Sequence, residues 1–314
     1  MPRVLRQFER RTGVSPTALT FFRYSCMCDA NLRRVVSCLI VAVTGGLAAT
    51  FTSTASAQTY VNTGPGRPMQ IEDAMPVARF TLESRLAPVS FGGVAGRTVA
   101  IVEPGLTYGL VPRLQVDIAA PVGFRHGNDG TSTGVAGIGL STLYAFNVET
   151  RVLPAVAARA SIVLPVGSFG PRRAHESLRA IATRTFPWGR LHFNHQYTFG
   201  DEPVPTVIEP SSVTASSDVG GVLSRWMTGV AVDHAFPIRG VLMAAELSAR
   251  HPLVDSLSVQ WHAGVGLRYQ LNAAVSLDVG GSAAFAGDER PWSVRFGVSR
   301  AMSLRRLTPG LGGR

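Results

Sequence analysis

Long runs of alternating apolar and polar residues restrict the fold of this chain more than any other feature. In the run 257–271, apolar side chains such as Trp261 and Leu267 occupy every odd position, and Ser, Gln, His, Gly or Arg occupies every even one. Successive side chains of a β-strand point to opposite faces, so one face of this segment is wholly apolar. Run 190–199 has the same alternation, and no stretch after residue 57 keeps helical spacing over three turns. The sequence therefore predicts an all-β protein.

Twelve such runs follow one another, and each is about 11 to 15 residues long. They cover residues 76–87, 97–109, 113–125, 134–147, 153–165, 176–187, 190–200, 222–236, 240–250, 257–271, 273–285 and 291–302. Ordinary globular strands average about 5–6 residues, whereas a tilted strand that crosses a bilayer needs roughly 9–11. The length of the runs favours membrane-spanning strands.

The links between the runs alternate in length. Short links follow the even-numbered runs, at residues 110–112, 148–152, 188–189, 237–239 and 272. Longer links follow most odd-numbered runs, at residues 88–96, 126–133, 166–175, 201–221, 251–256 and 286–290. Short periplasmic turns and longer outer loops are typical of outer-membrane barrels, and an even strand number puts both termini in the periplasm.

A closed antiparallel transmembrane β-barrel of about twelve strands is the fold that fits these patterns. Closure is required in lipid, because an open sheet edge would leave backbone groups without hydrogen bonds. The alternative is a periplasmic β-sandwich, in which the apolar faces of twelve long strands would pack against each other. A sandwich needs no systematic difference between the two kinds of link.

Residues 1–57 have the layout of a secretory signal peptide. Arg33 and Arg34 precede the apolar run 35–51, and a small-x-small site ends at Ala57, which predicts cleavage before Gln58. The alternative is a membrane anchor, but about 17 apolar residues are marginal for a span of roughly 20. Because residues 1–26 are long for the basic part of a signal, Met27 is an alternative start. Three domain calls follow: a short periplasmic N-terminal segment at 58–75, the β-barrel at 76–302 and a C-terminal tail at 303–314.

Removal of the signal changes the charge and the cysteine content. Cys26, Cys28 and Cys38 are all lost with it, which excludes a disulfide scaffold, a thiolate zinc site and a cysteine nucleophile. Seven of the thirty cationic residues and two of the twenty acids precede Gln58, so the net charge falls from +10 to +5. No basic cluster exceeds a pair of arginines, and we expect no nucleic-acid partner.

If the apolar faces contact lipid, the opposite faces line the lumen. This assigns to the interior Arg79, Glu83, Gln115, Asp117, Arg159, Arg179, Arg190, His192, Asn194, Gln196, Arg225, Asp233, Glu246, Arg250, Gln260, His262, Arg268, Asp278 and Arg295. Arginines outnumber acids in this set. Fixed positive charge favours anions in an open channel, whereas arginine–carboxylate pairs would fill and rigidify a narrow one. We expect a mostly filled lumen.

The sequence predicts no enzyme, no metal site and no bound cofactor. Ser258 and His262 share a strand face but lie about 13 Å apart at ~3.3 Å per residue, too far for a nucleophile and its base. There is no Gly-x-Ser-x-Gly elbow. His192 and His195 have opposite faces in a strand and cannot chelate together, and the turn 128–130 has the wrong spacing for a calcium loop.

Two segments resemble the outer-membrane family named for the meta-pathway of phenol degradation. Residues 154–170 (PAVAARASIVLPVGSFG) form an alternating strand that ends in Leu-Pro-x-Gly before a Gly-rich loop, and residues 191–201 read LHFNHQYTFGD. The glycine-led run 134–146 and residues 267–285 fit the same pattern. The resemblance covers roughly 99–302 and implies an outer-membrane barrel, some members being proposed to pass hydrophobic or aromatic compounds. It carries no catalytic or binding residues.

The sequence thus predicts a channel or transporter for small compounds in the cell outer membrane. Its expected partners are outer-membrane lipid, the barrel-assembly machinery and a small-molecule substrate. The alternatives are a structural or adhesive outer-membrane barrel, with its function in the 201–221 loop, and a periplasmic sandwich that binds a partner. Transport predicts a continuous polar lumen, and a structural role predicts interior charges closed into pairs.

Overall fold

The computed structural model describes Thr63 and residues 67–94, 97–127, 130–200, 224–236, 238–253, 258–287 and 290–304. The expected signal peptide (1–57), the 201–221 loop and the tail from residue 305 onward lie outside the described residues. Within the described ranges the secondary structure consists of strands, and no helix there is long and apolar enough to cross a bilayer.

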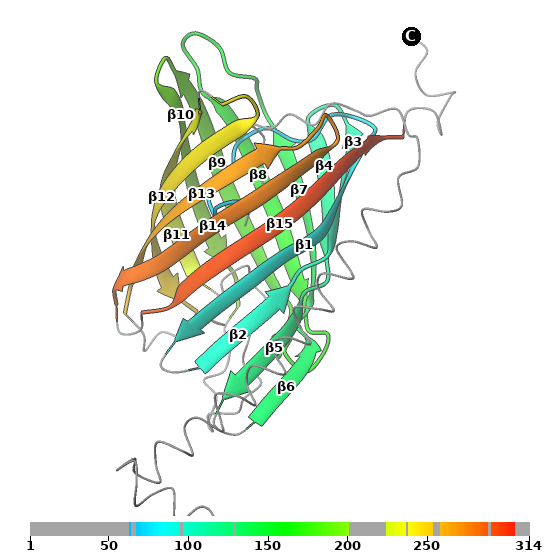
Figure 1. Ribbon diagram of the computed structural model, residues 1–314. Coiled ribbons are helices and arrows are strands. Elements are labelled where there is room, and N and C mark those ends of the chain that lie inside the picture. Colours follow the sequence, from blue (N-terminus) through cyan, green and yellow to red (C-terminus); the bar gives the residue numbers. More distant parts are fainter. Residues whose placement is uncertain are drawn as a thin grey trace, which may run out of the picture. The chain divides into compact units, whose positions relative to one another are not determined.

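The strands are numbered in chain order (Figure 1). They are β1 (Thr81–Val94), β2 (Arg97–Val102), β3 (Gly105–Val111), β4 (Leu114–Ala119), β5 (Val122–Gly127), β6 (Gly130–Val135), β7 (Ile138–Ala145), β8 (Ala155–Leu164), β9 (His175–Phe186), β10 (Gly189–Thr198), β11 (Ser224–Ala235), β12 (Val241–Pro252), β13 (Gln260–Gln270), β14 (Val275–Ala286) and β15 (Trp292–Ser303).

The sheet closes on itself through its first and last strands. β1 pairs antiparallel with β15 from Thr81↔Ser303 to Gly93↔Trp292, and the two lie side by side in Figure 1. The ring continues through antiparallel neighbours in the order β1, β3, β4 and β7 to β15. This twelve-strand ring confirms the predicted closed barrel. A sandwich of two separate sheets is ruled out, because no edge is left at the junction of β1 and β15.

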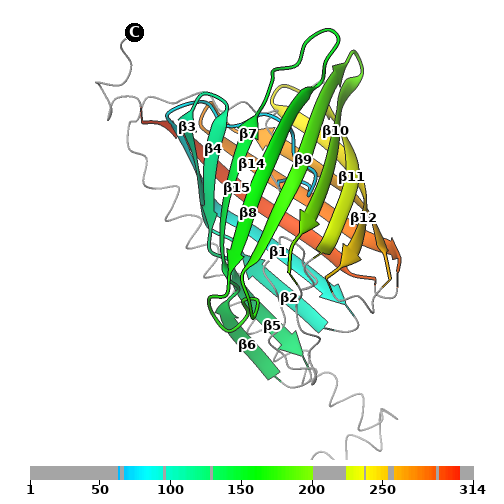
Figure 2. The same cartoon turned by 180° about the vertical axis from the view of Figure 1, so that it is seen from behind.

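Three further strands extend one end of the ring. The first half of β1 pairs with β3 and its second half pairs with β2, which continues the sheet into β5 and β6 (Figures 1 and 2). The predicted runs 97–109 and 113–125 are therefore each divided in two, at Pro104 and Pro121. Proline has no N–H to donate to a neighbouring strand, which explains the breaks.

The prediction of long outer loops was wrong at two of the six places. Residues 88–96 and 126–133 belong largely to the hairpins β1–β2 and β5–β6. Both stretches are rich in glycine, and 126–133 is also rich in small polar residues, which locally favour loops. Pairing with β15 and β2 supplies the hydrogen bonds that this local sequence does not predict.

The first strand begins later than the predicted run 76–87. Phe80 has a positive φ of 62°, so the chain turns there and enters β1 at Thr81. Residues 67–74, which precede this turn, are all buried. We call residues 67–74 the inner segment. The structure places this described part of the expected periplasmic segment within the barrel.

The outer face of the wall is apolar. In β13, Trp261, Val265 and Leu267 are 44%, 66% and 41% exposed, whereas the intervening His262 and Arg268 are buried. The alternation of the sequence therefore has its polar side inward. Aromatic pairs lie toward the strand ends, among them the stacked Phe186 and Trp188 and the edge-to-face Tyr197 and Phe199 at opposite ends of β10. Aromatic girdles at both rims are typical of membrane barrels.

Candidate functional site

The inner segment forms no strand, and wall side chains bind its main chain. Glu246 of β12 accepts hydrogen bonds at Oε2 from the backbone N–H groups of Gln70 and Ile71, at 2.8 and 3.0 Å. Asn194 of β10 accepts from the N–H of Glu72 at 3.1 Å and donates to its carbonyl at 2.8 Å. Buried backbone groups need such partners, so polar wall residues replace a neighbouring strand.

The same arrangement continues beyond the inner segment toward β1. The Thr183 hydroxyl accepts from the Ala74 N–H at 3.0 Å, and the Gln115 side chain accepts from the Val77 N–H at 2.9 Å. Successive contacts therefore come from β12, β10, β9 and β4. Residues 70–77 therefore run along the inside of the wall and contact four of its strands.

Glycines in the wall make room for the inner segment. A Cβ added at Gly280 of β14 would lie 2.2 Å from the carbonyl oxygen of Pro68, and one added at Gly266 of β13 would lie 2.7 Å from the Pro68 ring. A Cβ at Gly229 would meet the Ile71 side chain at 2.5 Å. Only a residue without a side chain allows this approach.

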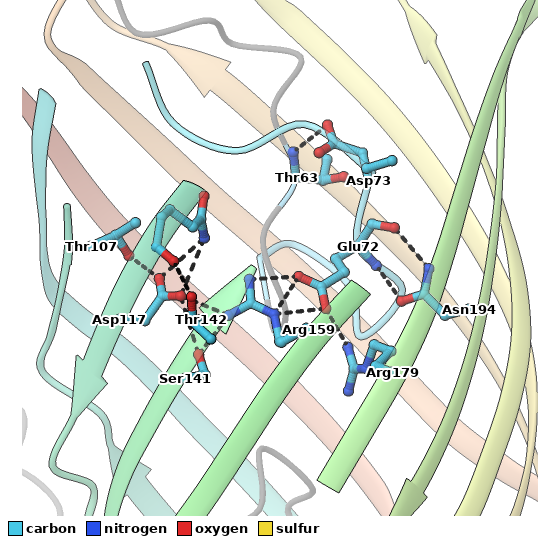
Figure 3. A network of polar contacts seen from close by, with 12 residues as sticks. Thr63, Glu72, Asp73, Thr107, Asp117, Ser141, Thr142, Arg159, Arg179 and Asn194 are labelled. Carbon is cyan, nitrogen blue, oxygen red and sulfur yellow. Dashed lines mark hydrogen bonds and ion pairs between the residues drawn. The ribbon is translucent and has the colours of Figure 1, made fainter. Parts of the chain in front are cut away.

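Glu72 lies at the centre of a network of buried charges. Arg159 of β8 binds its carboxylate through Nε, 3.0 Å from each oxygen, and through Nη2 at 2.8 Å. Arg179 of β9 binds it through Nη1 at 3.0 Å. Arg159 also pairs with Asp117 of β4 at 2.7 Å, so it lies between two carboxylates (Figure 3). Glu72 and Arg159 are nearly fully buried.

A second network surrounds Asp233 of β11. His192 Nε2 lies 3.0 Å from its carboxylate, and the Arg190 guanidinium donates to it through Nε at 2.9 Å. Arg190 also approaches Asp73 of the inner segment, at 3.5 Å. The shorter distance makes Asp233 the main partner of Arg190.

A third set of charges lies where the inner segment begins. Arg268 of β13 donates to Asp278 of β14 at 2.6 Å, and these two residues are directly opposite in the register. Arg67 pairs with Glu83 of β1. All four side chains are buried. Charges in such positions are tolerated when they are paired and hydrogen-bonded.

Most of the residues predicted to line the lumen have buried side chains. The structure buries Glu83, Gln115, Arg159, Arg179, His192, Asn194, Asp233, Glu246, Arg250, His262, Arg268, Asp278 and Arg295. Asp117, Arg190, Gln196 and Gln260 are half-buried.

Two of the residues predicted to line the lumen lie apart from the interior networks. Arg225 is half-buried and donates to the carbonyl oxygen of Gly200 at 2.6 Å, at the end of its strand. Arg79 is exposed, and its guanidinium lies 4.3 Å from the centre of the Phe80 ring. The assignment of Arg79 to the interior was wrong, because the chain reaches β1 only after the turn at Phe80.

Sequence reasoning missed the acids that balance the interior arginines. Glu72 and Asp73 precede the strands and have no alternation to place them. The available signal was the arginine excess among the predicted lumen residues, since buried cations need anionic partners. The nearest acids upstream of the first strand are the ones that fill this role.

A cavity of about 160 Å³ adjoins the Glu72 network. Its lining includes Arg85, Asp117, Arg159 and Arg179, together with Ser161, Ser177, Gln196, Thr198 and the apolar Leu140, Ile162 and Val163. The space is more than ten times the roughly 10–15 Å³ that one water molecule requires. It is large enough for a small organic molecule.

No family model matches the chain, and no curated protein matches it. Among solved structures, the COG4313 outer membrane channel from Pseudomonas putida F1 is similar at a TM-score of 0.48 and 13% identity, over 73% of this chain and 98% of that one. The KdgM porin is similar at 0.41 and 10% identity, over 70% and 98%. The CymD monoaromatic hydrocarbon channel is similar at 0.40 and 9% identity, over 79% and 99%.

These neighbours are an outer membrane channel, a porin and a hydrocarbon channel. At such identities and TM-scores the neighbours do not support an argument about this chain. Its fold is assigned from its own strand pairings, and its function is argued from the residues of its own interior. The resemblance to the meta-pathway family stays a prediction.

Proposed function

We propose that the protein is an outer-membrane channel for small compounds, and that the inner segment closes the lumen in this state. One observation carries the proposal. The lumen is occupied by a segment that belongs to no strand, and this segment is held by side-chain hydrogen bonds and ion pairs. Such an occupant can leave while the ring of backbone pairing stays intact.

The outer surface supports the location in a membrane. Apolar side chains such as Val265 and Leu267 are exposed along the wall, and the closed ring leaves no strand edge between β15 and β1. A closed barrel with an apolar outer face is one of the two structures that can span lipid. Delivery there by a signal peptide in residues 1–57 is part of the proposal.

The interior supports the passage of polar or charged solutes once the inner segment has moved. Glu72 would then no longer neutralise Arg159 and Arg179, and the wall would expose more cationic than anionic groups at that level. Rings of fixed charge set ion selectivity, so we propose a preference for anions. The resemblance noted in the sequence adds hydrophobic or aromatic compounds as a narrower substrate class.

A structural barrel without transport is the second candidate. The observation that favours it is the pairing of interior charges, as in Arg159 with Glu72 and Arg268 with Asp278. In that role the inner segment would serve as a permanent core. The two candidates differ in whether the inner segment can be displaced while the barrel stays folded.

Single-channel recording in a planar bilayer under a salt gradient separates them. The wild-type protein is expected to show rare openings, and Gly280→Ala frequent, anion-preferring ones, because the added methyl would lie 2.2 Å from the Pro68 carbonyl oxygen and so displace the inner segment. Gly281→Ala is the matched control, since its Cβ would lie 3.5 Å from the nearest atom, the Ser293 carbonyl oxygen. Insertion of a folded Gly280→Ala barrel without conductance would establish the structural role.

A further inference from the structure

The interior arginines of β8 and β9 form a site that the sequence alone does not reveal. We propose that Arg159 and Arg179 bind the carboxylate of a small organic acid, and that Glu72 occupies this site as an internal substitute. The inference rests on the proposed channel function, because it names the class of compound that the lumen accepts. It also states what displaces the inner segment.

The wall itself places the two cations together. Arg159 and Arg179 are directly opposite in the β8–β9 register, and both side chains point inward and are buried. Like charges at directly opposite positions destabilise a sheet unless an anion lies between them. The register therefore favours an anion beside these two arginines whether or not the inner segment is present, in addition to Asp117 on Arg159.

Glu72 shows which anion the site fits. Its two carboxylate oxygens receive Arg159 Nε, Arg159 Nη2 and Arg179 Nη1, all within 3.0 Å. A planar guanidinium matches the geometry of a carboxylate through two parallel donors, which distinguishes it from a simple point charge. A carboxylate brought by a ligand would meet the same donors.

The neighbouring cavity provides room for the rest of the ligand. Arg159 and Arg179 both belong to its lining, so the donors and the space of about 160 Å³ are continuous. Ser161 and Ser177, opposite in the register, and Val163 form the wall beside the arginines. Short side chains at these positions leave the volume free, and their mixed polarity suits a compact acid with an apolar body.

A third cation also faces this space. Arg85 of β1 lines the cavity and is only 6% exposed, and its Nε has no hydrogen-bond partner among the described residues. Two acids also line the space: Asp117 accepts from Arg159, Thr107 and Ser141, and Glu103 interacts electrostatically with Arg85. The lining thus holds three arginines and two acids, which favours an anionic ligand over a cationic one.

Calorimetric titration of the protein in detergent with benzoate tests the proposal. Benzamide serves as the neutral ligand of nearly the same shape. Glu72→Gln is expected to tighten benzoate binding about tenfold, or about 1.4 kcal/mol, because it removes the internal competitor. Glu149→Gln is the matched control, since it makes the same change at a carboxylate that pairs with Arg184 in the β7–β8 link, outside the strands. It is expected to change the benzoate affinity less than twofold.

Arg179→Gln supplies the opposite change and is expected to weaken benzoate binding at least tenfold in the Glu72→Gln background. The proposal is overturned if Glu72→Gln binds benzoate no more tightly than wild type, or if benzamide binds as well as benzoate. Because binding is measured in detergent, it does not depend on conductance. A barrel that binds benzoate but never conducts would defeat the channel function alone, and one that conducts but ignores benzoate would defeat this site alone.

Discussion

Asn194 binds the main chain of Glu72 at both of its polar groups. The side-chain oxygen accepts from the Glu72 N–H at 3.1 Å, and the side-chain nitrogen donates to the Glu72 carbonyl at 2.8 Å. A strand neighbour would offer the same donor and acceptor pair. One buried amide on β10 thus fixes the height at which the Glu72 carboxylate meets Arg159 and Arg179.

Substitution Asn194→Leu removes both of these hydrogen bonds and leaves the Glu72 backbone groups buried without partners. Docking of the inner segment is expected to weaken by about 1–3 kcal/mol. Hydrogen exchange followed by mass spectrometry should show faster exchange in peptides covering residues 67–77. Peptides from β13 and β14 should keep their wild-type rates.

Asn147→Leu is the control for this prediction. Asn147 also binds main-chain groups through its amide, accepting from Val156 and donating to Pro154, but it lies in the β7–β8 link. Its substitution should speed exchange in that link and leave the inner segment unchanged. If Asn194→Leu also leaves the inner segment unchanged, the amide contacts are not what holds it.

The outward position Leu267 offers a test of the membrane face. Leu267→Arg places a charge at a residue that is 41% exposed on the apolar side of β13. If this face contacts lipid near the midplane, the free energy of unfolding should fall by roughly 2–4 kcal/mol. Urea titration in lipid vesicles, with loss of the folded band on a gel as readout, measures the change.

Val152→Arg is the matched control, because Val152 is 84% exposed in the β7–β8 link, outside the strands. It should unfold at the wild-type urea concentration. Equal stability of Leu267→Arg and Val152→Arg in vesicles would contradict a lipid-facing β13.

The buried pair of Arg268 and Asp278 predicts a non-additive result. Arg268→Leu leaves the Asp278 carboxylate buried without its guanidinium partner, which is expected to cost about 3–5 kcal/mol of unfolding free energy. The double variant Arg268→Leu with Asp278→Leu should recover most of that loss, since no lone charge remains. Urea midpoints of the two single variants and the double variant supply the thermodynamic cycle, and simple additivity would show that the two charges are independent.

Arg113 carries backbone strain in the two-residue turn between β3 and β4. Its φ is 69°, in the left-handed region that costs a residue with a Cβ roughly 1–2 kcal/mol. Arg113→Gly should therefore raise the unfolding free energy by on the order of 1 kcal/mol, less the bond that its guanidinium donates to the Phe146 carbonyl. Thermal unfolding in detergent gives the measurement.

Arg151→Gly provides the comparison for that turn. Arg151 lies in the β7–β8 link and is not among the non-glycine residues with positive φ. Glycine there should lower the unfolding free energy slightly, because it raises the conformational entropy of the unfolded chain without relieving any strain in the native link. If both substitutions raised the unfolding free energy, the positive φ of Arg113 would not be the reason for the gain.

The alternating pattern was enough to predict the wall of this barrel. Strict alternation, as at Trp261 and His262, assigned one face outward and one inward, because side chains on a strand have only two directions. Run length and link length then predicted the closed antiparallel ring, which the pairing of β1 with β15 confirms. Local pattern is sufficient here, since each strand repeats the same two-residue period.

The residues that fill the ring became known from the folded structure. Glu72 lies 87 residues from Arg159 in the chain and is joined to it by a buried ion pair. No repeating sequence pattern relates these two residues, because the hydrogen bonds of the inner segment are made with side chains on several strands. The length of β1 was likewise decided by its pairing with β15 along both halves. Contacts of this kind depend on the closed wall, which brings distant residues to one level, and so they cannot be read from the sequence near either partner.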